Sequence, residues 1–168
     1  AARGTCIVNS GKGQVWIGPG GKAARVLYST HRGDTWSVAQ PPFVSGETSS
    51  GIFSLAFKDS LNGIATGGDY QKPDQSQNNV ATTIDGGRTW MLVDESNQLA
   101  YRSCVRYFPG RNNHLLAVGR NGSDKSVDGG KTWSAVDTVG YYVLDFAPDK
   151  KIGWAAGKDG RISRITIQ

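Results

Sequence analysis

An eight-residue pattern recurs three times along the chain and limits its fold more than any other feature of the sequence. Two copies read S/T-x-D-G-G-x-T-W and one departs from it; they occupy residues 29–36, 83–90 and 126–133. Their tryptophans are 54 and then 43 residues apart, and the sequence between them is of β type. A period of this length indicates stacked β-sheet repeats, such as the blades of a propeller.

Each copy of the pattern predicts a tight hairpin turn between two strands. Gly tolerates positive φ, and an Asp carboxylate accepts bonds from the backbone N–H groups that a turn leaves unpaired. The Thr and Trp then begin the next strand, where the indole can bury a large apolar surface. The first copy has His31 in the place of the Asp, so its turn is expected to be held differently. We assign a structural role to Asp85, Gly87, Thr89, Trp90, Asp128, Gly130, Thr132, Trp133, Ser29, Gly33, Thr35 and Trp36.

The composition agrees with an all-β repeat protein. Gly makes up 23 of the 168 residues, about twice its usual share, whereas the helix former Glu occurs only twice. The repeats align as units that each start with an apolar inner strand, followed by a strand of small residues ending in Gly. The four units span approximately residues 1–43, 44–99, 100–139 and 140–168.

The fourth unit has no Thr-Trp strand, so we predict an all-β propeller segment of about 3.75 four-stranded blades. An open sheet edge is an aggregation site unless it is paired or covered. Two interpretations follow: the chain is part of a larger propeller, or chains associate to complete one. A compact four-bladed ring fits less well, because the residues before Thr5 are too few to supply the absent strand.

The three turns resemble the Asp-box (BNR) repeats of sialidases, sortilin-type receptors and the photosystem II stability/assembly factor-like proteins. The stretches 51–57, 67–70 and 153–160 are most similar to the last group and its bacterial relatives. The resemblance covers nearly the whole chain. It implies a propeller fold and a place outside the cytoplasm, in a periplasm, a lumen or the exterior. It says little about activity, because in the family these turns lie away from the ligand face and a fold does not determine function.

An enzymatic function finds little support in the sequence. Glycoside hydrolysis usually needs a paired acid and nucleophile or base, but Glu47 and Glu95, the only glutamates, both lie in polar loops. A resemblance to sialidases would also imply an Arg-Ile-Pro segment, which is absent. His31 and His114 have no metal-ligand spacing. We therefore predict no catalytic, cofactor or metal site, and keep a glycan-binding or sialidase-like glycoside hydrolase propeller as the alternative.

The two cysteines carry one structural expectation. Cys6 and Cys104 align on equivalent inner strands with one unit between them, whereas a disulfide requires Cα atoms within about 7 Å. An internal disulfide is therefore disfavoured, and two buried thiols are expected.

The loops and the charge point towards binding. The insertion at residues 69–79 is expected on the loop-rich face of the propeller, where long loops on a rigid scaffold often bind partners; a solvated, tolerant insertion fits it equally well. The net charge is +5, and four arginines fall between residues 102 and 120. Such a cluster favours acidic protein surfaces or anionic ligands, although ordinary solvated arginines fit it as well.

We predict a non-catalytic extracytoplasmic binding or assembly module that engages a protein client. The resemblance to photosystem assembly factors implies that an arginine-rich propeller surface grips a membrane-protein client. The expected partners are an acidic or membrane-associated protein and either a second copy of the chain, as a homodimer, or a missing propeller half. A glycan is the alternative, and nucleic acid is not expected, because no recognition signature is present. The hypothesised partner-binding residues are Arg102, Arg106, Arg120, Asp69, Tyr70 and Lys72.

Overall fold

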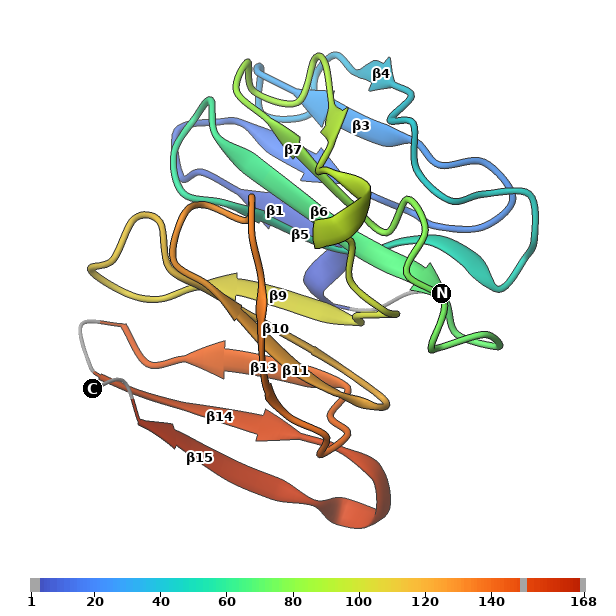
Figure 1. Ribbon diagram of the computed structural model, residues 1–168. Helices are drawn as coiled ribbons and strands as arrows, with labels where there is room; N and C mark the ends of the chain where they lie inside the picture. Colours follow the sequence, from blue (N-terminus) through green and yellow to red (C-terminus); the bar gives the residue numbers. More distant parts are fainter. Residues whose placement is uncertain (1–3, 149–150, 167–168) are drawn as a thin grey trace.

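The computed structural model describes residues 4–148 and 151–166, which form four antiparallel β-sheets that follow one another along the chain (Figure 1). Within each sheet the strands pair in chain order. The described residues otherwise contain three short 3-10 turns, η1 (Gly4–Cys6), η2 (Glu95–Asn97) and η3 (Lys158–Gly160). No helix among them is long and apolar enough to cross a membrane. The predicted all-β architecture is confirmed.

The sheets are named A to D in chain order. Sheet A contains β1 (Ile7–Asn9), β2 (Val15–Ile17), β3 (Val26–Ser29) and β4 (Ser37–Ala39). Sheet B contains β5 (Ser50–Phe57), β6 (Gly63–Asp69), β7 (Val80–Thr83) and β8 (Met91–Leu92). Sheet C contains β9 (Cys104–Tyr107), β10 (Leu115–Gly119), β11 (Gly122–Ser126) and β12 (Ser134–Asp137). Sheet D contains three strands in the described residues, β13 (Val143–Phe146), β14 (Ile152–Ala156) and β15 (Ile162–Thr166).

Three hydrophobic cores join the consecutive sheets. Successive side chains of a strand point to opposite faces, so an inner sheet offers one apolar face to the sheet before it and another to the sheet after it. In sheet B, Leu55 and Ala65 belong to the core shared with sheet A, whereas Ala56 and Ile64 belong to the core shared with sheet C. A third core joins sheets C and D. The sheets are therefore stacked face to face in chain order.

The repeated turns are held by hydrogen bonds to two side chains. In the second copy, Thr83 Oγ1 accepts the N–H of Gly87 (3.0 Å) and donates to Asp85 Oδ1 (2.9 Å). The same carboxylate accepts the N–H groups of Arg88 and Thr89 at 3.0 Å each, and the Thr89 hydroxyl at 2.6 Å. The third copy repeats this set. The carboxylate thus satisfies the donors that the glycine-rich turn leaves unpaired.

The first copy reaches a similar turn with different chemistry. Ser29 Oγ accepts the N–H groups of His31 (3.1 Å) and Gly33 (3.0 Å). His31 Nδ1 lies 3.0 Å from Thr35 Oγ1, so the imidazole replaces the carboxylate as the partner of this hydroxyl. Arg32 adopts a φ of 59° where the other copies have Gly, and this conformation costs a non-glycine residue about 1–2 kcal/mol.

The tryptophan of each repeat differs in burial according to its sheet. Trp90 is 7% exposed in the core between sheets A and B, and its indole N–H donates to Gly87 O over 3.0 Å. Trp133 is half-buried against the core between sheets B and C. Trp36 lies directly before β4 of sheet A and is 42% exposed. In the second and third copies, the tryptophan therefore packs against the sheet that precedes its own.

Both cysteines are buried and carry free thiols. Cys104 Sγ lies 3.4 Å from the backbone N and O atoms of Leu144, and so links sheet C to β13 of sheet D. Burial raises the pKa of the Cys104 thiol above its usual value, although the charge of Arg106 opposes the shift. The thiol is accordingly protonated and contributes packing and a weak hydrogen bond.

The tryptophans should contribute to stability in the order of their burial. Replacing Trp90 with Ala should lower the free energy of unfolding by about 3–5 kcal/mol, because it empties a site in a closed core. Trp36→Ala should cost less than about 1 kcal/mol, because that indole is already in contact with solvent. Urea unfolding followed by circular dichroism measures both values. Equal losses for the two variants would contradict this account of the cores.

The carboxylate of the third turn should make stability dependent on pH. Burial by itself raises the pKa of Asp128, but bonds from Thr132, Ser126 and Lys131 outweigh it and lower the pKa from 3.8 to about 2. Because the folded state has the lower pKa, this stabilisation is complete above about pH 4 and is lost as the pH falls towards 2. Asp128→Asn should therefore be less stable at pH 7 and lose less stability on acidification. Urea titrations at several pH values test this, and parallel pH profiles would refute it.

Candidate functional site

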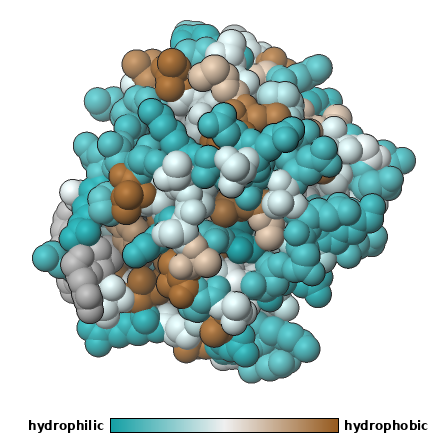
Figure 2. Space-filling view, viewed as in Figure 1, coloured by the Kyte–Doolittle hydropathy of each residue, from teal (hydrophilic) through white to brown (hydrophobic). Residues whose placement is uncertain are grey.

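The loops at one edge of the stack are bonded to one another and form a connected surface, which we call the loop face. They comprise residues 18–25, 40–49, 70–79, 93–103, 120–121, 138–142 and 157–161. Val44 N–H donates to Asn78 O, and Tyr101 N–H donates to Pro73 O, both over 2.9 Å. Loops that are distant in sequence are therefore fixed relative to each other. Hydrophilic side chains dominate the side of the molecule drawn in Figure 2, and hydrophobic ones form small separate groups.

The insertion between β6 and β7 is folded by its own hydrogen bonds. Asp69 is 6% exposed, and its Oδ1 accepts the N–H of Gln71 over 2.9 Å. At the other end of the insertion, Asn79 Nδ2 donates to Gln75 O (2.7 Å) and to Leu99 O (2.9 Å). Asp69 and Asn79 thus hold the ends of the loop, while residues 74–77 between them are exposed.

A glutamine continues the bonding of β7 beyond its last strand partner. Gln98 Oε1 accepts the N–H groups of Asn79 (2.7 Å) and Val80 (2.8 Å). Its Nε2 donates to Val80 O (3.2 Å) and to Val93 O (2.8 Å). The side-chain amide therefore pairs with the backbone as a neighbouring strand would, and it fixes the link between sheets B and C.

Arg102 is a buried structural residue two positions before β9, so it does not present its side chain to a partner as the partner-binding hypothesis requires. It is 6% exposed, and its Nε donates to Asp124 Oδ2 over 2.6 Å. Its Nη1 also donates to Tyr101 O (3.0 Å) and to Asn121 Oδ1 (2.9 Å). The side chain turns beneath the hairpin between β10 and β11, where the buried Asp124 carboxylate and the half-buried Asn121 amide oxygen accept its hydrogen bonds.

Arg106 lies apart from this ion pair, among the inner strands. Its Nε is 3.5 Å from Asp145 Oδ1 of β13, and its Nη1 donates to Val105 O over 3.2 Å. It lines a recess of about 330 Å³ with residues of β1 and β5, among them Ile7 and Leu55. Arg102 and Arg106 therefore do not form one exposed patch.

Three of the hypothesised partner-binding residues lie at the surface of the loop face. Lys72 and Arg120 are exposed and Tyr70 is half-buried. Arg120 is exposed, and its Nη1 donates to Tyr70 O over 3.0 Å. The half-buried Tyr70 ring meets Phe53 edge-on, with ring centroids 6.1 Å apart. Asn121, beside Arg120, donates to Pro73 O over 3.1 Å. The hairpin of sheet C therefore supports the insertion of sheet B.

The partner-binding residues hypothesised from the sequence leave out several basic residues that the fold places beside Lys72 and Arg120. Every connection between the second and third strands of a sheet carries at least one exposed Lys or Arg. These residues are Lys22, Arg25, Lys72, Arg120, Lys158 and Arg161. The sequence signal that could have found them is their shared place in the repeat, because equivalent positions of stacked sheets lie at one edge of the stack.

A polar pocket of about 470 Å³ adjoins the insertion. Two carboxylates line it, Asp74 of the insertion and Glu95 of η2, together with the amides of Gln75, Gln77 and Gln98. Asp74 accepts a bond from Asn121 Nδ2. Within the described residues, no group of three or more His, Cys, Asp or Glu could hold a metal ion. The pocket thus offers hydrogen-bonding groups suited to a hydroxyl-rich or amide-rich ligand.

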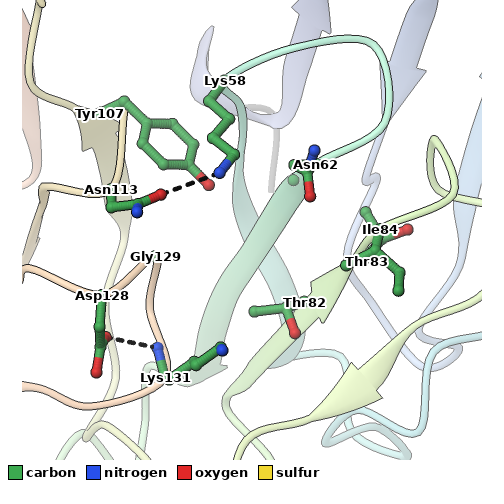
Figure 3. A pocket seen from close by; sticks show the side chains of 11 residues that line it. Lys58, Asn62, Thr82, Thr83, Ile84, Tyr107, Asn113, Asp128, Gly129 and Lys131 are labelled. Atoms are coloured by element: carbon green, nitrogen blue, oxygen red, sulfur yellow. Dashed lines mark hydrogen bonds between the residues drawn. The ribbon is translucent and has the colours of Figure 1, made fainter. Parts of the chain in front are cut away.

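A second cavity, of about 290 Å³, opens between sheets B and C at the opposite edge, beside the repeated turns (Figure 3). There Lys58 Nζ donates to Asn113 Oδ1 over 3.0 Å, which joins the two sheets. Burial, and secondarily the charge of Asp59, raises the pKa of Tyr107 well above its usual value, so its hydroxyl is protonated. Asp128 turns to its own backbone. This cavity therefore lies among the packed turns and is separate from the loop face.

No protein family and no curated protein matches the sequence, but solved structures match the fold. An ancestral GH74 enzyme matches with a TM-score of 0.69 and 15% identity, over 96% of this chain and 22% of the enzyme. YCF48 from Cyanidioschyzon merolae matches with a TM-score of 0.67 and 19% identity, over 95% of this chain and 49% of its own. YCF48 bound to D1 peptide gives 0.58 and 16%, over 88% and 49%. The fold is a β-propeller segment.

The propeller likeness confirms the predicted fold class and establishes no activity, because every identity is below 20%. The chain spans about half the length of the YCF48 structures and less than a quarter of the enzyme. The four sheets A to D can accordingly be described as propeller blades, with the loop face at one edge of the blades and the repeated turns at the other.

The buried ion pair should distinguish Arg102 from its exposed neighbour in the same blade. Arg102→Ala leaves the Asp124 carboxylate buried without its cation, which should cost about 3–5 kcal/mol of stability. Arg120→Ala removes an exposed guanidinium and should cost less than about 1 kcal/mol. Thermal and urea unfolding of both variants measure the difference. A loss for Arg102→Ala as small as that for Arg120→Ala would refute the burial of this pair.

Proposed function

We propose that the chain is a non-catalytic binding or assembly module that engages a protein client through the loop face. The observation that carries the proposal is the bonding of the insertion to the hairpin loop of sheet C, by Asn121 to Pro73 and by Arg120 to Tyr70. A surface that is already ordered loses less conformational entropy when it binds. The exposed side chains of residues 71–77 are therefore presented on a fixed support.

The charge of the loop face favours an acidic segment as the client. Exposed Lys or Arg side chains occur in all four second-to-third-strand connections, where six of them stand against two exposed carboxylates, Asp74 and Asp159. Opposite charges speed encounter and select partners. The fold likeness to YCF48 bound to D1 peptide supports a protein or peptide as the client.

We also assign the turns to the Asp-box type and the chain to the photosystem II assembly factor-like proteins, acting outside the cytoplasm. The carboxylate bonding of the second and third turns supports the first assignment. The fold likeness to two YCF48 structures supports the second. Fractionation of the native cell, with detection by antibody, tests the location; recovery from the cytoplasm alone would contradict it.

The client proposal is tested by charge reversal on the loop face. Lys72→Glu combined with Arg120→Glu should abolish retention of the client in pull-downs from native extract, with bound proteins identified by mass spectrometry. Wild-type retention should fall as salt rises from about 0.05 to 0.5 M. The matched control reverses two exposed lysines near the turns, Lys12→Glu with Lys131→Glu, and should retain the same client. Equal retention by the loop-face variant would eliminate this surface.

A glycan-binding function is the second candidate, and the pocket beside the insertion favours it. Asp74, Glu95 and the amides of Gln75 and Gln77 line its volume of about 470 Å³, and such groups bind sugar hydroxyls. The likeness to a GH74 enzyme supports a test for turnover as well as for binding. A glycan-array signal that disappears in Asp74→Asn with Glu95→Gln would support this candidate. Unchanged binding in that variant, or no signal with the wild type, would remove it.

A further inference from the structure

The cavity between sheets B and C lies where aromatic rings fill the interface between sheets A and B. In sheet A, Trp16 and Tyr28 pair in register and pack into the core shared with sheet B, where Trp16 stacks on Phe57. Sheet B carries the smaller Ile64 and Thr82 as the corresponding pair, and Thr82, like Tyr28, directly precedes a repeated turn. The smaller side chains account for an open volume of about 290 Å³. We call it the turn cavity; its lining includes Lys58, Asn62, Tyr107, Asn113, Asp128 and Lys131.

Two ammonium groups reach the turn cavity from the two facing sheets. Lys58 belongs to the loop after β5 of sheet B, and Lys131 belongs to the repeated turn of sheet C. In Figure 3, Lys58 extends to Asn113, while Lys131 extends towards Thr82. Among the described residues, neither ammonium takes part in an ion pair. Two cations at one small cavity repel each other, whereas an anion between them is attracted by both.

The neutral groups of the lining are mostly hydrogen-bond donors. Tyr107 is protonated, because burial raises its pKa, so its hydroxyl is able to donate. Asn113 Oδ1 accepts from Lys58, which leaves the amide Nδ2 as a donor. The Thr82 hydroxyl adds a further donor. Asn62 differs, since its Nδ2 donates to the Asp59 carboxylate and its Oδ1 is left as an acceptor.

The carboxylate in the lining is occupied by its own turn. Asp128 Oδ1 accepts the N–H groups of Lys131 and Thr132 at 3.0 Å each, and its Oδ2 accepts the Thr132 hydroxyl at 2.6 Å. Asp59, which is close enough to act on the pKa of Tyr107, likewise accepts two backbone N–H groups. Bonds of this kind offset the negative charge of a carboxylate. The cations and the donors therefore dominate the surface that a ligand would meet.

We infer that the turn cavity binds a phosphate group, either as the free ion or as the monoester of a small hydroxylated molecule. Phosphate oxygens accept charge-assisted hydrogen bonds from both ammonium groups and further bonds from the Tyr107 and Thr82 hydroxyls. Asn62 Oδ1 suits a hydroxyl of the ester. The volume lies near the lower limit for small-molecule pockets, about 300 Å³, so the organic part must be small. This site is at the edge of the blades opposite the loop face.

Titration with inorganic phosphate at constant ionic strength, followed by amide NMR spectra, tests the inference. The backbone amides of Lys58, Asn113, Gly129 and Lys131 should shift together and saturate. Lys58→Gln and Lys131→Gln should each raise the dissociation constant at least about tenfold, because each removes a bond between charged groups. A second titration uses glycerol phosphate. Tighter binding than that of inorganic phosphate identifies a monoester as the ligand, and equal or weaker binding identifies the free ion.

Thr82→Tyr tests the cavity without removing a charge. The variant introduces the residue that sheet A carries at the equivalent Tyr28, so its ring should fill the turn cavity and abolish saturable phosphate binding. Both lysines remain in place. Cooperative melting and a dispersed amide spectrum show that the variant is folded. The two lysine variants change exposed side chains, so they test the site even if Thr82→Tyr does not fold.

The matched control is Arg88→Gln. Arg88 occupies in the second turn the position that Lys131 occupies in the third, but Trp16 fills the interface beside it. This variant should bind phosphate like the wild type, as should the loop-face variant Lys72→Glu with Arg120→Glu, which separates this site from the client proposal. Amide shifts that do not saturate would overturn the inference. So would tight binding by folded Thr82→Tyr or by Lys131→Gln, or a loss in Arg88→Gln equal to that in Lys131→Gln.

Discussion

The structure depends on the bonded turn that ends the third strand of a blade. Its carboxylate fixes the backbone, and the fixed backbone then positions groups that reach the neighbouring sheet. Gly87 O accepts the indole N–H of Trp90, while Gly86 O accepts that of Trp16 from sheet A over 2.8 Å. Trp16 in turn stacks on Phe57, with ring centroids 3.8 Å apart. One turn at the edge therefore sets the packing of two blades, and buried indoles bring both packing area and a polar group that needs a partner.

The repeat made the fold readable from sequence, because turn chemistry and strand alternation are local signals that recur at fixed positions. The burial of side chains near the loop face could not be predicted from the sequence. Arg102 meets Asp124 only because a hairpin folds over it, 22 residues further along the chain, whereas the sequence alone placed Arg102 and Arg106 together among the hypothesised partner-binding residues. The same difficulty hid Gln98, whose amide acts as a strand partner. Such contacts follow from tertiary packing, which a single sequence does not display.

The two edges of the blades differ in how their polar groups are used. At the turns, carboxylates and hydroxyls bond to the adjacent backbone within four residues. These polar groups are therefore occupied in holding the turns. At the loop face, bonds run between segments about 20 to 50 residues apart, and basic side chains remain exposed. Binding of a protein client on this scaffold is therefore expected at the second edge, where fixed backbone and unused side chains coincide.

The stacking of the sheets has a consequence for motion. Each hydrophobic core joins two consecutive sheets, so sheets B and C are packed on both faces while sheets A and D are packed on one. Amide hydrogens in such an array exchange through opening of whole structural units, and a unit opens at a lower free energy when fewer of its faces are packed. One bond crosses this order, since the Thr5 hydroxyl lies 3.4 Å from Ser103 O at the start of sheet C. This bond ties the residues before β1 to the start of sheet C. Local opening of sheet A is therefore restrained at its inner strand, β1, and is easiest at its outer strand, β4.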